Sequence, residues 1–411
     1  LLARSRTQEC AALINLGEPD KARPLCDEAR QLNTDAGDQR GAAKAVNLVA
    51  NAAWQQGKIA EAKQLYEQAL NISQTIGDKI DEAGALNNLA NILDDQGDHD
   101  GAIKTYRKSI QVAKERDDKA GTALAQQNLG VVFFEKGDAK SGSAMLQNAI
   151  QMSRQIGDKS TEATVLNNLC MLSMDAGELR KAKINCEDSL RLRREIDSKP
   201  DMARSLTTRG SVQLAEGNLV GAGKDYGDAL KMQQTLGQKA DMAYTQIALG
   251  RLALAGQHYA DAQKLASDAI TALAAEKDAG GEAEAHAILA QADAALKNMA
   301  GAETEIASAK KLMESSSDKK TRFRVELAEA QVDLESGKNE EAVAKLEKVE
   351  KEIGTTGMVA LGLEVRLALG KAQMQAGKNL QARTQLDTLS RNAKDKGFLL
   401  ISEEAAKATR P

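Results

Sequence analysis

The chain has 411 residues, of which only 2 % are aromatic and four are proline, and its formal net charge is −4. So few aromatic residues argue against a β-sandwich or barrel, whereas abundant Ala, Leu, Gln, Glu and Lys favour helices. The slightly acidic balance argues against a general nucleic-acid binder, which needs a basic face. No apolar run is long enough to span a bilayer and no signal peptide is visible, so we expect a soluble chain that is not embedded in a membrane.

A spacing of 40 residues organises the sequence from its start. Glycine recurs at this spacing at Gly17, Gly57, Gly97, Gly137, Gly177, Gly217, Gly337 and Gly377. Gln257 and Lys297 hold the two places where glycine is missing. Seven residues before and five residues after each of these places, the residue is always Ala, Gly or Cys. Ten consecutive matches at two positions predict ten repeated units, which is the signature of a solenoid.

A second turn signal lies half a period away, at Gly37-Asp38, Gly77-Asp78 and Gly157-Asp158. Glycine suits the C-terminus of a helix, and aspartate suits the N-cap of the next one. Apolar residues recur at spacings of three and four between the turns, so each unit is predicted to be two antiparallel helices. We therefore expect an all-α solenoid of ten helix pairs as one continuous domain over residues 1–397. Residues 398–411 are predicted to form a capping helix and tail, in which Phe398, Leu399 and Ile401 cover the last core face.

The segment NNLANILDDQGDHDGAIKTYRKSI at 87–110 carries a resemblance to a known family. A leucine and a small residue on the first helix, glycine at the hairpin and alanine on the second helix resemble tetratricopeptide repeats. The period of 40 is similar to the long-repeat subgroup typified by kinesin light chain, the Pins/LGN proteins and bacterial regulators. This resemblance implies a right-handed superhelix whose first helices line a concave, peptide-binding groove.

The sequence shows no pattern typical of a catalytic centre. None of its three histidines has another histidine at metal-binding spacing, and there is no phosphate loop, dinucleotide fingerprint or nucleophile elbow. We therefore expect no enzyme activity, no cofactor and no metal. Four aspartates surround the third hairpin, at Asp94, Asp95, Asp98 and Asp100. They could attract a divalent cation, but we favour a solvated turn with an N-cap aspartate.

The four cysteines form two pairs with the same spacing. Cys10 and Cys26 are 16 residues apart, and so are Cys170 and Cys186, four repeats later. Each pair lies at the same level on opposite helices of a hairpin. A disulfide needs Cα atoms within about 7 Å, whereas packed helices are usually about 8–10 Å apart. Two interpretations stay open: disulfides, which indicate an oxidising compartment, or small residues buried in the core. We expect a cytoplasmic location, with an extracytoplasmic part of an anchored parent as the alternative.

Amide side chains repeat on the predicted first helices. We call the following set the amide ladder: Asn47, Asn51, Asn87, Asn88, Asn91, Gln127, Asn128, Asn167 and Asn168. Asparagine is a mediocre helix former, so its repetition at these helix positions indicates a specific structural or binding role. Two interpretations stay open, a brace between neighbouring repeats and contact with the backbone of a bound peptide, which an amide matches with its donor and its acceptor.

Charged and aromatic residues replace the amides in repeats six and seven. Arg204, Tyr244 and Arg251 are predicted to extend the groove and to suit a peptide that bears a carboxylate. Arg209 stands where the other repeats usually have leucine, and it either lines the groove or extends its charged end to solvent.

We therefore predict a non-catalytic interaction module that binds a peptide or partner protein. The alternative is the C-terminal regulatory region of a larger bacterial signalling protein, because the ending AKDKGFLLISEEAAKA looks similar to such regions of Ser/Thr kinases and winged-helix regulators. The chain begins with Leu1 rather than Met, so we expect an upstream segment, to which a signalling domain would be joined.

Overall fold

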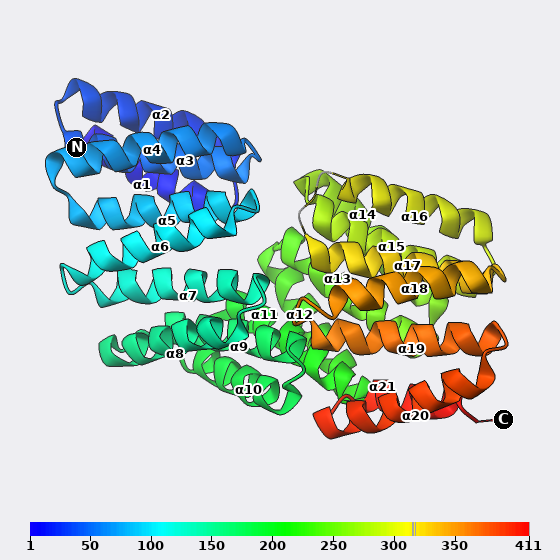
Figure 1. Cartoon of the computed structure of the whole chain (residues 1–411). Coiled ribbons are helices and arrows are strands. Elements are labelled where there is room, and N and C mark those ends of the chain that lie inside the picture. The colour runs from blue at the N-terminus through cyan, green and yellow to red at the C-terminus, as the bar shows by residue number, and fades with distance from the viewer. Residues whose placement is uncertain (315, 317, 411) are drawn as a thin grey trace. The chain divides into compact units, whose positions relative to one another are not determined.

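The structure is a computed structural model that describes residues 1–314, 316 and 318–410. These residues form twenty-one α-helices and no β-strand, which confirms the predicted all-α class (Figure 1). The helices are α1 (Leu2–Asn15), α2 (Pro19–Asp35), α3 (Gln39–Gln55), α4 (Ile59–Ile76), α5 (Lys79–Asp95), α6 (His99–Lys114), α7 (Lys119–Glu135), α8 (Ala139–Ile156), α9 (Lys159–Asp175), α10 (Leu179–Glu195), α11 (Lys199–Ala215), α12 (Leu219–Leu236), α13 (Lys239–Ala255), α14 (Tyr259–Glu276), α15 (Ala279–Ala295), α16 (Met299–Met313), α17 (Lys319–Glu335), α18 (Asn339–Ile353), α19 (Val359–Gln375), α20 (Asn379–Lys396) and α21 (Leu399–Ala408). Among the described residues, no helix combines the length and the hydropathy needed to cross a lipid bilayer.

The helices form hairpins that stack on one another. In most repeats the two helices of a unit make the most extensive contacts, as α3 does with α4 and α7 with α8. The first helices of successive units also contact one another, as α3 does with α5 and α5 with α7. The second helices make no comparably extensive contact with each other in the described part of the chain. Within each of the two units described below, the odd-numbered helices therefore form one layer, which we call the inner layer, and the even-numbered helices form the other, outer layer.

The turns explain why the chain keeps its period of 40. Every glycine of the hairpin series has a positive φ, from 72° at Gly17 to 81° at Gly137. Gln257 and Lys297, which replace it twice, adopt the same left-handed conformation with φ of 61° and 66°. The turn geometry is thus kept even where glycine is absent. The left-handed conformation is energetically less favourable for Gln257 and Lys297 than for glycine, because both residues have a Cβ atom.

The two helices of a hairpin cross most closely where the sequence keeps a small residue. In several repeats the small residue seven places before the hairpin glycine faces the residue nine places after that glycine. A Cβ added to Gly130 would lie 2.7 Å from Leu146 Cγ, and one added to Gly210 would lie 2.5 Å from Tyr226 Cε1. The small residue is therefore required by the short distance between the helices, and a large partner fills the space opposite.

The chain divides into two compact units, Leu1–Thr161 and Glu162–Pro411, and the boundary falls within α9. In the second unit the last helices pack against its first ones. Helix α21 contacts α11, and one core cluster joins Leu179 on α10 to Leu386 and Phe398 near the C-terminus. Phe398 and Ile401 are buried as predicted, but Leu399 is 39 % exposed and does not cover the core.

Candidate functional site

The amide ladder in the first unit connects successive inner helices. Asn88 on α5 donates from Nδ2 to Asn47 Oδ1 on α3 over 3.1 Å. Asn128 on α7 donates from Nδ2 to Asn87 Oδ1 and Asn91 Oδ1 on α5, over 3.2 and 3.3 Å. These five members of the ladder thus brace neighbouring repeats, which is one of the two interpretations of the sequence.

Buried tyrosines from the outer helices complete this network. Tyr66 on α4 donates its hydroxyl to Asn51 Oδ1 over 2.6 Å, and Tyr106 on α6 donates to Asn91 Oδ1. Burial raises the pKa of both phenols well above the usual range, so each stays protonated and remains a donor. The sequence analysis missed these partners. The signal for them is their place nine residues after a hairpin glycine, where Tyr226 also stands.

Bracing engages only one end of each amide. No hydrogen bond is formed by Nδ2 of Asn47, Asn51 or Asn91, or by Oδ1 of Asn88 or Asn128, within the described part of the chain. All five side chains are half-buried, and none of these atoms is among the buried polar atoms that lack a partner. Three donors and two acceptors on the inner helices are therefore not fully buried and form no hydrogen bond within the described residues.

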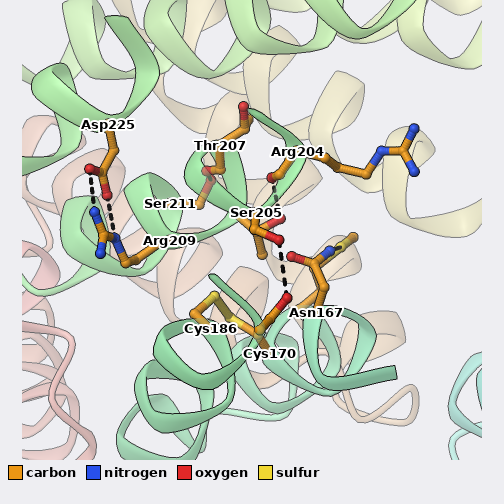
Figure 2. Close-up of a disulfide and its surroundings, with 12 residues drawn as sticks. Asn167, Cys170, Cys186, Arg204, Ser205, Thr207, Arg209, Ser211 and Asp225 are labelled. Atoms are coloured by element: carbon orange, nitrogen blue, oxygen red, sulfur yellow. Dashed lines mark hydrogen bonds and ion pairs between the residues drawn. A yellow bond between two sulfur atoms is a disulfide. The ribbon is translucent and has the colours of Figure 1, made fainter. Parts of the chain in front are cut away.

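The remaining members of the amide ladder differ from one another. Gln127 and Asn168 are half-buried, whereas Asn167 is only 3 % exposed. Asn167 Nδ2 lies 4.0 Å from Met171 Sδ, and its Oδ1 is buried without a hydrogen bond (Figure 2). The Asn167 side chain is thus buried in the protein interior, and it does not offer its amide to a ligand.

The three residues predicted to extend the groove each bind an acidic residue of the following repeat. Arg204 pairs with Asp241, Tyr244 with Asp278, and Arg251 with Glu284. Glu284 also accepts from Arg324 Nη1 of the next repeat, over 2.5 Å. A carboxylate-bearing peptide would have to compete with these internal carboxylates, so the three side chains serve here as braces like those of the first unit.

Arg209 does not extend freely to solvent, because its guanidinium is paired with a carboxylate. Its Nε and Nη2 atoms lie 2.6 Å from the two carboxylate oxygens of Asp225 on α12, as Figure 2 shows. The Asp225 side chain is only 5 % exposed, so the ion pair is largely buried. The equivalent residues one repeat later are Leu249 and Leu265, so this repeat has two charged residues where the next repeat has two apolar ones.

Both cysteine pairs are disulfides in the structure. The Cys10–Cys26 bond joins α1 to α2, with Cα atoms 5.2 Å apart, and the Cys170–Cys186 bond joins α9 to α10, with Cα atoms 5.3 Å apart (Figure 2). Each pair occupies the two facing positions of the close helix crossing, where other repeats have a small and a large residue. The short distance at this crossing is what permits a covalent bond between packed helices.

Comparison with known proteins agrees with this architecture. Residues 2–75 and 81–155 match the family model described as "Tetratricopeptide repeat". A search of curated proteins finds no sequence match.

Several solved structures share the fold at low sequence identity. A Rap protein complexed with competence and sporulation factor has a TM-score of 0.56 and 13 % identity, with 90 % of this chain and 99 % of that chain covered. The quorum sensor NprR from B. thuringiensis, in its apo form, has a TM-score of 0.53 and 14 % identity, with 76 % and 87 % covered. A STAND signal-transduction ATPase with a tetratricopeptide repeat sensor, from Pyrococcus horikoshii, has a TM-score of 0.52 and 16 % identity, with 80 % and 52 % covered. The family match thus covers the repeats within residues 2–155, and the solved structures share the fold of stacked helix pairs.

Proposed function

We propose that the chain is a non-catalytic interaction module that binds an extended segment of a partner protein along the inner helices α3, α5 and α7. The observation that carries this proposal is the divided use of the amides. One end of each asparagine braces the repeats, and the other end is left as a donor or an acceptor on the inner face.

The spacing of the inner helices suits a peptide backbone. Packed helices lie about 8–10 Å apart, and an extended chain advances about 3.3 Å per residue, so each repeat faces about three residues of a bound segment. A peptide offers one N–H and one C=O per residue, which complement an array of amide acceptors and donors. Recognition through the backbone gives affinity without demanding one particular sequence.

The fold neighbours agree with this function at the level of architecture. One of them is complexed with competence and sporulation factor, and another is a quorum sensor. Those properties belong to these proteins. For this chain they support the choice of a ligand-binding groove over a purely structural stack of repeats.

The test replaces the free donors without breaking the brace. Asn47→Asp, Asn51→Asp and Asn91→Asp each keep an oxygen in the place that accepts the bracing bond and remove the free Nδ2 donor. A random peptide library displayed on phage is selected against the full chain with its disulfides intact, and the affinity of a selected peptide is measured by calorimetry. We expect the triple variant to bind at least tenfold more weakly while its thermal unfolding temperature is maintained.

Two controls separate bracing from binding. Tyr106→Phe removes a bracing hydrogen bond from the outer side, so we expect lower stability with the affinity unchanged. Asn71→Asp adds the same negative charge on the exposed face of the outer helix α4, and should change neither property. If the triple variant binds the peptide as tightly as the wild type, the amide ladder is a brace alone.

A second function is favoured by one of the fold neighbours. In the STAND ATPase the tetratricopeptide repeat sensor is part of a longer protein, of which this chain covers 52 %. The array would then be the regulatory region of a signalling protein. The coding sequence upstream of Leu1 distinguishes the two: a kinase, ATPase or DNA-binding domain there supports regulation, and a start codon close to Leu1 supports a separate adaptor.

The two disulfides bear on where the protein acts. Stable disulfides form in oxidising compartments and are rare in the cytosol. We infer from the paired Cys10–Cys26 and Cys170–Cys186 bonds that the array is extracytoplasmic, which favours the alternative location over the cytoplasm. A thiol count on the unfolded, unreduced protein as purified from its native source tests this inference, since four free thiols would contradict it.

A further inference from the structure

The aspartates around the third hairpin have separate roles in the structure. Asp98 caps helix α6, because its Oδ1 accepts from the Gly101 amide over 2.9 Å. Asp95 accepts from Trp54 Nε1 over 2.7 Å, and Asp100 pairs with Lys136 over 2.5 Å. Asp94 is different because it faces His99. The sequence analysis described this region as a cluster of aspartates and did not include the histidine.

Asp94, His99 and Glu135 bring three metal-ligating groups together from three helices. Asp94 Oδ1 at the end of α5 lies 2.8 Å from His99 Nδ1 at the start of α6. Glu135 Oε2 at the end of α7 lies 3.9 Å from the same nitrogen. One ligating atom from each of the three residues lies within 4.8 Å of the other two. Asp94 and His99 flank one hairpin, and Glu135 comes from the next repeat, so the cluster bridges repeats three and four.

We propose that Asp94, His99 and Glu135 form a binding site for a zinc ion. An imidazole nitrogen with two carboxylate oxygens is a donor set that suits Zn²⁺, whereas Ca²⁺ and Mg²⁺ prefer oxygen ligands alone. Zinc takes such ligands at about 2.0–2.2 Å, so the three groups need to converge only slightly around the ion. A water molecule completes the tetrahedral coordination.

The geometry of the cluster suits one shared cation. Both carboxylates face the same imidazole nitrogen, His99 Nδ1, so an ion at that point would be held by one atom of each of the three residues. The side chains are 19 %, 34 % and 47 % exposed for Asp94, His99 and Glu135, so they have access to an ion and room to reorient.

Binding would join the third hairpin to the C-terminal end of α7. Asp94 follows Asn91 by three residues on α5, and Glu135 follows Asn128 by seven residues on α7. Asn91 and Asn128 are hydrogen-bonded to each other. The ion would therefore reinforce the same interface between repeats that the amide ladder braces. This inference stands independently of the proposed peptide binding.

The chain contains a matched control for the histidine. His286 is also flanked by two carboxylates, but Glu305 faces its Nδ1 and Glu282 faces its Nε2, the latter at 3.8 Å. The two acids lie on opposite sides of the ring and cannot share one ion with the same nitrogen. His286→Ala therefore removes a histidine with similar neighbours without touching the proposed site.

The experiment measures zinc binding to the full chain without a histidine tag. Isothermal titration with Zn²⁺ should give one ion per chain with a dissociation constant in the micromolar range. His99→Ala should abolish this binding, and Glu135→Gln should weaken it at least tenfold. His286→Ala and Asp100→Asn, a neighbouring carboxylate outside the cluster, should bind as the wild type does.

A second readout reports coordination directly. Co²⁺ bound in place of Zn²⁺ should show the visible absorption of a four-coordinate ion in the wild type and lose it in His99→Ala. Excess Zn²⁺ should raise the unfolding temperature of the wild type and leave that of His99→Ala unchanged. No binding by the wild type, or equal binding by His99→Ala, would overturn the proposal.

Discussion

The buried Arg209–Asp225 pair gives the most informative prediction about stability. The bidentate contact has two N–O distances of 2.6 Å, and the Asp225 side chain is 5 % exposed while that of Arg209 is 23 % exposed. Arg209→Leu strands a carboxylate in the interior, and we expect a loss of about 3–5 kcal/mol of unfolding free energy. Asp225→Leu strands a guanidinium that can still reach solvent, so we expect a smaller loss of about 1–3 kcal/mol.

The double variant should behave differently from the sum of the two. Arg209→Leu combined with Asp225→Leu introduces the residue type that stands at both equivalent positions one repeat later, Leu249 and Leu265. Replacing a buried ion pair with packed apolar residues is often neutral or stabilising by about 1–4 kcal/mol. We therefore expect the double variant to be at least as stable as the wild type.

Native-state hydrogen exchange is the assay for this cycle, because long repeat arrays need not unfold in one step. The opening free energies of α11 and α12 are read by mass spectrometry for the wild type, both single variants and the double variant. Additive losses, or a larger loss for Asp225→Leu than for Arg209→Leu, would refute the reasoning from burial.

Three further predictions concern packing, the disulfides and pH. Gly130→Ala places a Cβ 2.7 Å from Leu146 Cγ, so we expect it to lower the free energy of unfolding by about 1–3 kcal/mol. Gly227 lies in the middle of a helix and its added Cβ meets nothing within 4 Å, so Gly227→Ala should raise the free energy of unfolding by about 0.5–1 kcal/mol. Urea unfolding of the two variants checks this, and equal effects would contradict it. Reduction of both disulfides should lower stability by about 3 kcal/mol for each 16-residue loop, measured by urea unfolding with and without reductant, and Cys10→Ala with Cys26→Ala should reproduce half of the loss. Burial, and next the nearby Asp78, raise the pKa of Asp81 in the folded state, so its contribution to stability is fully present below 3.8 and is lost as the pH rises through the folded value. Asp81→Asn should therefore raise the unfolding temperature at pH 7 and flatten its pH dependence, and a variant less stable at pH 7 would contradict this sign.

The sequence by itself determined the repeat architecture, because the features that define it are local. A left-handed turn every 40 residues, an N-cap aspartate after it and small residues at the helix crossing are each readable from one or two positions. Repetition then raises a weak local preference to a firm prediction. The spacing of Cys10 and Cys26 also predicts that they face each other, but it left open whether they form a disulfide, because packed helices usually lie farther apart than such a bond allows.

Only the tertiary structure decided which polar groups meet. Whether Asn91 is a brace depends on Tyr106 and Asn128, which approach it from another helix and another repeat. In the same way Asp225 gives Arg209 its partner, and Glu135 joins Asp94 and His99 from 36 residues beyond the histidine. Contacts between side chains of different helices cannot be predicted from residue spacing within one segment. Hydrogen-bonding and metal-ligating groups interact over a few ångströms in space, whatever their separation along the chain.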